Sequence, residues 1–222
     1  MKASLQLKNI YSRLTYDYWR RILPKYGFTK KGVAVLECGI GAGHFLRLLE
    51  GWFPKATLFG LDIDPSTLFR IGQSGKEKML LAASAEMLPF PEQRFDFVIS
   101  LHMIEHLHKP EDFFREAARV LSPGGTLAFA TPNPLGISAR LLKSRWSGWH
   151  PEHISLKAPA DWREILRQHG FSIVRDGTTG LSGIPSFRTL PLGLLNWGPL
   201  FLFGFFPWQH GEAYICISRR VP

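Results

Sequence analysis

The stretch Val33-Ala-Val-Leu-Glu-Cys-Gly-Ile-Gly-Ala-Gly-His-Phe45 decides the fold of this 222-residue chain. Its first four residues are aliphatic and predict a buried parallel strand with Glu37 at the carboxyl end. Three glycines then lead into a helix that begins near Phe45. Glycine adopts backbone angles that other residues avoid, and it lets a ligand lie directly against the main chain. Because a helix start also offers unpaired N–H groups and partial positive charge, this turn predicts a ligand site.

Two kinds of cofactor use a glycine-rich turn between a strand and a helix. A dinucleotide site requires G-x-G-x-x-G, and counting from Gly39 the third glycine position holds His44, which disfavours a nicotinamide cofactor. The pattern present is E-x-G-x-G-x-G, formed by Glu37, Gly39, Gly41 and Gly43. It resembles the first motif of class I methyltransferases that depend on S-adenosylmethionine (SAM). A turn of this kind also serves as a plain strand-to-helix connection, so the other motifs must decide.

A carboxylate follows the second predicted strand, which covers residues 57–61. Asp62 lies roughly twenty residues after the glycines, where a carboxylate accepts hydrogen bonds from the two ribose hydroxyls of a nucleoside. The methyltransferase resemblance adds Ile63 to the expected cofactor contacts. Asp64 precedes Pro65 and is expected to cap the next helix instead.

A third short strand is expected over residues 79–83, and Ser84-Ala-Glu-Met-Leu-Pro-Phe-Pro91 follows it. With the F-D-x-V run of the fourth strand, this segment resembles the methyltransferase pattern in which an acidic residue and its neighbour contact adenine. The resemblance therefore implies that Ser84, Ala85 and Glu86 contact the adenine. The family usually has aspartate where this chain has Ser84; a serine bonds the adenine amine more weakly, and Glu86 is an alternative partner.

The fourth strand leads into Leu101-His-Met-Ile-Glu-His-Leu-His108. In isolation, H-x-x-E-H matches an inverted zinc-protease motif. We reject that interpretation because no third ligand is evident and because the segment lies where a methyltransferase needs a cofactor wall. The segment instead resembles the M-x-E-H stretch of small-molecule methyltransferases of the ubiquinone-biosynthesis type. That resemblance implies that Leu101, His102 and Met103 line the cofactor pocket and that His106 points to the methyl acceptor.

The resemblance extends over about residues 33–135 and includes an R-V-L-x-P-G-G turn over residues 119–126 before a fifth strand at 127–130. It implies an α/β, Rossmann-like, seven-stranded sheet, mostly parallel with an antiparallel last strand and with helices on both faces. Residues 170–174 and 213–218 independently predict the last two strands. The length suits one domain over 1–222.

Three segments are additions to this scaffold: an N-terminal helical cap over 1–31, and acceptor-side insertions over 132–157 and 181–210. The last contains LPLGLLNWGPLFLFGFFPW, from Leu190 to Trp208. Its prolines and glycines argue against a regular membrane-spanning helix, and the chain must return to the same sheet. A buried lid over an apolar pocket is the favoured interpretation, followed by shallow membrane insertion and then a dimer contact.

Two histidines are candidate catalytic bases, His106 and His153, because a neutral imidazole is available near physiological pH. His153 belongs to an H-P-x-H run after a P-N-P turn, which resembles the Methyltransf_23-like branch of the superfamily. Two histidines three residues apart, His150 and His153, are weak support for a metal, so we expect no metal site.

The net charge of +9 and the isoelectric point of about 9.8 allow nucleic acid or an anionic membrane surface as partners, although a solvated basic face is the favoured interpretation. Nucleic acid is disfavoured because the Asn/Asp-Pro-Pro-Tyr motif of amino-group methylation is absent after the fourth strand. Two cysteines give no disulfide framework, and the N-terminus has no apolar signal-peptide core. We therefore expect a cytoplasmic protein, with membrane association as an option.

The predicted function is SAM-dependent methyl transfer to a small lipophilic acceptor, such as a quinone, an isoprenoid or a lipid. An RNA or protein methyltransferase that uses the basic surface is the alternative enzyme class. A non-catalytic SAM-binding module is the alternative outside enzymes, and product turnover distinguishes it. The sequence specifies neither the acceptor nor the oligomeric state.

Overall fold

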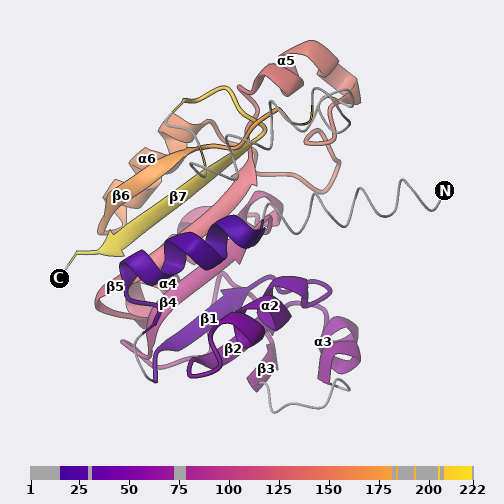
Figure 1. The fold of residues 1–222 in the computed structure, drawn as a ribbon. Coiled ribbons are helices and arrows are strands. Elements are labelled where there is room, and N and C mark those ends of the chain that lie inside the picture. The colour runs from indigo at the N-terminus through magenta and orange to yellow at the C-terminus, as the bar shows by residue number, and fades with distance from the viewer. Residues whose placement is uncertain are drawn as a thin grey trace.

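A seven-stranded sheet with the order β3-β2-β1-β4-β5-β7-β6 forms the centre of the molecule (Figure 1). The computed structural model describes residues 16–29, 32–72, 79–181, 184, 193, 205 and 208–221. The strands are β1 (Ala34–Cys38), β2 (Thr57–Asp62), β3 (Met79–Ala82), β4 (Phe95–Leu101), β5 (Leu121–Pro132), β6 (Phe171–Thr178) and β7 (Ala213–Arg220). Strand β7 runs antiparallel to both of its neighbours, and the other pairs are parallel. The predicted Rossmann-like sheet with an antiparallel last strand is thus confirmed.

Helices cover both faces of this sheet, because successive residues of each strand point to opposite sides. The α-helices are α2 (His44–Trp52), α3 (Pro65–Gly72), α4 (Pro110–Val120), α5 (Ile137–Leu142) and α6 (Pro159–Gln168). The 3₁₀ turns are η1 (Leu23–Tyr26), η2 (Ile104–His106) and η3 (Lys143–Arg145), and residues 16–22 form a further stretch of helix. In β1, Val35 packs with α2 and the helix of 16–22, whereas Leu36 packs with α4 and α6.

The helix of residues 16–22 packs its apolar side against the sheet. Tyr18, Trp19 and Ile22 are buried there, and Gly27 ends the helical segment with a φ of 96°. Phe205, a described residue of the apolar insertion, lies 5.1 Å from Tyr18 between ring centroids. The rest of the predicted cap and of the segment from Leu190 to Trp208 falls mostly outside the described residues. Among the residues that are described, no helix is long and apolar enough to cross a bilayer.

Strand β5 begins earlier than the sequence indicated. The turn expected over 119–126 is wrong from Leu121 onward, because Leu121 already pairs with Phe95 and Thr126 pairs with Phe97. The intervening residues bulge out of the ladder, and Gly124 takes a φ of +72° there. A bulge keeps the local proline and glycine geometry while letting the strand continue.

The topology gathers the ends of several strands at one edge of the sheet. The carboxyl ends of β1, β2 and β4 meet there because these strands are parallel. Antiparallel β7 begins at the same edge, where Ala213 pairs with Pro132 at the end of β5. Consequently the glycine turn, the segment after β4 and the loop after β5 all lie at this edge, where ligands bind in open α/β sheets.

Candidate functional site

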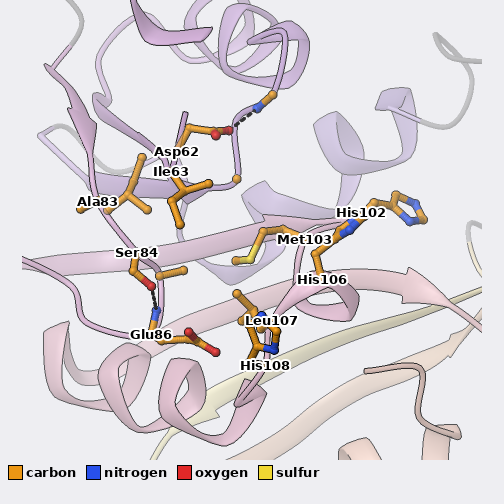
Figure 2. Close-up of a pocket in the computed structure, with 14 residues that line it drawn as sticks. Asp62, Ile63, Ala83, Ser84, Glu86, His102, Met103, His106, Leu107 and His108 are labelled. Carbon is orange, nitrogen blue, oxygen red and sulfur yellow. Dashed lines mark hydrogen bonds between the residues drawn. The ribbon is translucent and has the colours of Figure 1, made fainter. Parts of the chain in front are cut away.

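A cavity of about 480 Å³ opens at the carboxyl edge of the sheet, a size typical of small-molecule sites (Figure 2). It is lined by residues from the glycine turn and from the segments that follow β2, β3 and β4: Gly39, Gly41, Leu61, Asp62, Ile63, Ala83, Ser84, Ala85, Glu86, His102, Met103, His106, Leu107 and His108. We call it the first cavity.

The glycine turn leaves open space above its backbone. Gly41 has a φ of +46°, and no described atom lies within 4 Å of the position that a Cβ would take. At Gly39, in contrast, a Cβ would come 2.4 Å from Cγ of Met103, so only glycine fits. Gly43 precedes α2 with a φ of 67° and faces Ile71 rather than the cavity. The turn therefore combines one tightly packed glycine with one that a ligand could approach directly.

Asp62 ties the glycine turn to the end of β2. Its Oδ2 accepts a hydrogen bond from the Gly41 amide at 2.9 Å, and its Oδ1 accepts one from the Asp64 amide at 3.1 Å. A carboxylate has about four acceptor positions, so capacity remains for the hydroxyls of a ligand. Asp64 instead accepts bonds from the Ser66 amide at 2.9 Å and from the Thr67 hydroxyl at 3.0 Å, which confirms its predicted capping role.

The opposite wall of the first cavity is the segment after β3. Figure 2 shows Ser84 and Glu86 across the hollow from Asp62. The Ser84 hydroxyl accepts a bond from the Glu86 amide at 3.1 Å, and Glu86 Oε1 accepts one from the Lys109 amide at 2.6 Å, just before α4. These bonds fix a short polar wall that could receive a purine ring.

The structure brings most of the predicted cofactor contacts together. Those that line the first cavity are Gly39, Gly41, Asp62, Ile63, Ser84, Ala85, Glu86, His102 and Met103. Those that lie outside its lining are Glu37, Gly43 and Leu101. Sequence reasoning did not single out Leu61, Ala83, Leu107 or His108, which also line it. Leu61 and Ala83 directly precede two predicted contacts, and that adjacency was the available signal.

Glu37 is buried in β1, with 3% of its surface exposed, and its Oε2 has no hydrogen-bond partner among the described residues. Burial raises the pKa of this carboxyl well above its usual range, and the nearby Asp62 charge adds to the effect.

A second cavity of about 250 Å³ lies beside the first. Its lining comes from the segment after β4, the loop after β5 and the start of β7: His102, Glu105, His106, Pro132, Ser147, Gly148, His153, Glu212 and Ala213. His102 and His106 line both cavities and so form the wall between them. His102 has a φ of 56°, and its amide donates to the Ala130 carbonyl at 2.8 Å. A non-glycine residue held in this region stores about 1–3 kcal/mol of strain, a pattern common at functional sites.

The two predicted bases meet in the second cavity, with 4.7 Å between the ring centroids of His106 and His153. Nδ1 of His106 lies 3.0 Å from the Glu152 carbonyl, and Nδ1 of His153 lies 2.8 Å from the Gly148 carbonyl. Because a carbonyl oxygen only accepts hydrogen bonds, each Nδ1 carries the proton. In the neutral ring Nε2 then has a free lone pair, which could accept a proton or bind a metal.

Glu105 lies beneath the two histidines and is completely buried. Burial acts to raise the pKa of this carboxyl, but interactions with His102 and Thr131 outweigh it and hold the pKa below its usual value. The Thr131 hydroxyl donates to Oε2 at 3.1 Å, and Nδ1 of His102 lies 3.4 Å from Oε1. The floor of the second cavity therefore carries a buried negative charge.

Comparisons with known proteins give the same assignment as the geometry. The profile of the Methyltransf_23 family, described as a methyltransferase domain, matches residues 11–176, more than half of the chain. A malonyl-[acyl-carrier protein] O-methyltransferase of Methylococcus capsulatus is 30% identical over 160 residues, which cover 70% of this chain and 58% of the relative. A fatty-acid O-methyltransferase of Mycolicibacterium smegmatis is 35% identical over 109 residues, which cover 47% of this chain and 39% of the relative. The chain thus spans less than two thirds of the length of these curated relatives.

A solved SAM-dependent methyltransferase from Aquifex aeolicus shares the fold, with a TM-score of 0.65, 18% identity and 97% of each chain covered. Its likeness concerns the sheet and helices, whereas the family profile covers the glycine turn, Asp62 and the H-M-I-E-H segment as well. The cofactor implied by family and fold is SAM. The open space above Gly41, the Asp62 carboxylate and the polar wall at Ser84 fit such a group. The chain belongs to the Methyltransf_23 family of methyltransferase domains and has the fold of class I SAM-dependent methyltransferases.

Proposed function

We propose that the chain methylates a small lipophilic acceptor of the quinone, isoprenoid or lipid kind, held in the second cavity. One observation carries this proposal: His102 and His106 line both cavities, so an acceptor in the second lies next to a cofactor in the first. The uncharged run from Leu190 to Trp208 and the fatty-acid O-methyltransferase among the relatives support an apolar acceptor.

The cofactor residues are proposed from their places around the first cavity. Asp62 would accept bonds from the ribose hydroxyls, Gly39 and Gly41 would let the methionine part lie against the backbone, and residues 84–86 would receive the adenine. His102 and Ile63 would close the sides of the site. Three further predicted residues would support the turn from outside the lining: Glu37, Gly43 and Leu101.

SAM supplies a methyl group activated on a positively charged sulfur. The protein must therefore align the acceptor with that methyl group and keep water out. His106 and His153 would accept the proton of a hydroxyl acceptor through Nε2, because each Nδ1 is already committed to a carbonyl. An acceptor that carries no proton at the reacting atom would need only the alignment.

We also propose that residues 1–222 act as one domain, in which 1–31 form a cap and 132–157 and 181–210 are acceptor-side insertions. The described parts of these segments are residues 16–29, all of 132–157, and residues 181, 184, 193, 205 and 208–210. Basic residues near the N-terminus would attract an anionic membrane surface, at about 1 kcal/mol for each lysine or arginine near the lipid. The protein would then draw its acceptor from that surface.

The test is to incubate the protein with isotope-labelled SAM and separate lipid, quinone and water-soluble extracts, and to find the labelled product by mass spectrometry. We expect label in an apolar compound. Label found only in RNA, protein or polar metabolites would contradict the proposal. Flotation with anionic liposomes tests the membrane part: high salt and Phe203→Glu should both reduce binding, and a protein that never floats would exclude it.

A further inference from the structure

Three potential metal ligands from two distant segments converge in the second cavity. One carboxylate oxygen of Glu105, one ring nitrogen of His106 and one of His153 all lie within 4.8 Å of one another. The sequence motif offered only the first two, together with His102, and no third ligand was evident beside them. The fold supplies His153 from the loop that follows η3.

Glu105 has an unused ligand position that points to a cation. Its side chain is completely buried, and Oε1 has no hydrogen-bond partner among the described residues. Nδ1 of His102 lies 3.4 Å away, close enough to interact electrostatically with this oxygen but longer than a usual hydrogen bond from nitrogen. A buried carboxylate oxygen without a hydrogen bond is costly, so an ion that binds it is favoured.

A second carboxylate faces the same cavity. Glu212 accepts a bond from Nε1 of Trp146 at 2.7 Å through Oε1, while its buried Oε2 has no partner in the described part of the chain. Among the described residues, the lining of the second cavity contains no lysine or arginine. Two carboxylates without such a partner in this lining favour a positive ion.

The histidines are already oriented as metal ligands. Both donate Nδ1–H to a backbone carbonyl, of Glu152 for His106 and of Gly148 for His153. Metal-binding histidines almost always make such an outer bond, because it fixes the ring and leaves Nε2 free for the metal. The loop that carries His153 thus provides both a ligand and the two carbonyls that orient the ligands.

We propose that Glu105, His106 and His153 bind one divalent transition-metal ion, for which Zn²⁺ is the best match. Two imidazoles and one carboxylate form a common catalytic zinc set, which keeps further positions open for water or substrate. Bond lengths of about 2.0–2.2 Å require ligand atoms no more than about 4 Å apart, so the three groups must close slightly around the ion. This site replaces our expectation that the chain binds no metal.

The metal site implies a class of acceptor, and this part rests on the proposed function. With the ion bound through Nε2, His106 and His153 would be ligands and not bases, and the ion would stabilise the deprotonated oxygen of the acceptor in their place. An ion held by Glu105, His106 and His153 would take an oxygen donor, such as a hydroxyl or carboxylate, at its open position. That position lies beside the wall shared with the first cavity, so the bound oxygen would face the methyl group.

The experiment measures the metal directly. The purified chain is stripped with EDTA and titrated with Zn²⁺ by calorimetry, and Co²⁺ is added separately to follow its visible absorption. We expect one bound ion and a Co²⁺ spectrum of a nitrogen- and oxygen-bound site. Loss of an outer-shell partner commonly weakens a metal site about 10- to 100-fold, and removal of a ligand in His106→Ala, His153→Ala or Glu105→Gln should cost at least that.

The matched control is His150→Ala, which removes an exposed histidine of the same loop and should leave Zn²⁺ affinity unchanged. Far-UV circular dichroism checks that each variant is folded. If Glu105→Gln does not fold, His153→Ala is the test variant, because His153 is only partly buried and its replacement should disturb the fold less. No bound ion in the wild type, or full affinity in His153→Ala, overturns the metal site. SAM affinity is measured in parallel: its absence with intact Zn²⁺ binding would refute the proposed function and leave the metal site standing.

Discussion

The two cavities are built in different ways, although they share a wall. The first is made largely of turns that directly follow β1, β2 and β3, and hydrogen bonds such as that from Gly41 to Asp62 join these turns. The second is made of side chains from segments far apart in the chain, which include His106, His153 and Glu212. A binding site for a common cofactor can be encoded in local motifs, whereas a site for an individual acceptor depends on how distant loops meet.

The two cavities also differ in how they shift the pKa of a buried glutamate, Glu37 beside the first and Glu105 in the second. Burial, with help from Asp62, raises the pKa of Glu37 on the first side. On the second side, interactions with His102 and Thr131 outweigh burial and lower the pKa of Glu105. The same residue type therefore has its pKa raised in one region and lowered in the other.

Gly41→Val should have the largest effect on cofactor binding. A branched side chain would fill the open space above the turn, and we expect SAM affinity to fall by more than about a hundredfold. Gly124→Val is the control, since Gly124 has a φ of +72° and also has open space around its Cβ position. Each variant carries similar backbone strain, but only Gly41 lies in the first cavity. Equal SAM affinities by calorimetry would show that the turn is purely structural.

Asp62→Ala should cause the next largest loss of SAM affinity. It removes charge-assisted bonds worth about 1.5–3 kcal/mol, so SAM binding should weaken roughly 10- to 100-fold. Asp64→Ala is the paired variant, because it removes the α3 cap and should lower stability by about 1 kcal/mol with little change in SAM affinity. A folded Asp62→Ala protein with wild-type affinity would exclude the ribose assignment.

Variants of the second cavity should affect turnover rather than cofactor binding. For an acceptor that reacts through a hydroxyl, we expect His106→Ala or His153→Ala to reduce kcat by about a hundredfold or more, with SAM affinity nearly unchanged. Rates measured from pH 6 to 9 would check this. If both variants keep wild-type rates, the histidines are not bases and alignment alone supports the reaction.

The two glutamates predict opposite pH dependences of stability, with EDTA present to exclude metal. Because the pKa of Glu37 is raised in the folded protein, Glu37 contributes to the free energy of unfolding below about pH 4.3. That contribution is lost as the pH rises through the pKa of Glu37 in the folded protein. Because the pKa of Glu105 is lowered in the folded protein, Glu105 contributes to the free energy of unfolding above about pH 4.3. That contribution is lost as the pH falls through the pKa of Glu105 in the folded protein. Urea unfolding of Glu37→Gln and Glu105→Gln against wild type measures both, with slopes of at most about 1.4 kcal/mol per pH unit. If the difference in unfolding free energy between wild type and variant changed with pH in the same direction for both glutamates, the predicted opposite pH dependences would be wrong.

The sheet could be predicted from the sequence because its signals are local. Aliphatic runs, the glycine turn and alternation in β7 each mark a strand or its end within a few residues. The early start of β5 was missed because Pro123 and Gly124 normally signal a turn, whereas pairing with β4 continued the strand around a bulge. Tertiary pairing overrode the local preference there.

The arrangement of the second cavity could not be predicted from such local signals. His106 and His153 were chosen separately, from motifs that say nothing of their distance. Their contact depends on carbonyls of Gly148 and Glu152, in a loop without periodic pattern. No local pattern marked Glu105 or Glu212 as neighbours of His153 either, because each needs the third dimension to be recognised.

The wall shared by the two cavities has a consequence for how the ligands influence each other. If His102 or His106 moves when one cavity fills, the shape of the other cavity changes with it. Thermodynamic linkage then requires reciprocity: the factor by which a bound cofactor changes acceptor affinity equals the factor by which a bound acceptor changes cofactor affinity. His102 is a good candidate to carry that coupling because its backbone is strained. If binding of one ligand relieved this strain, the affinities for the cofactor and for the acceptor would both change.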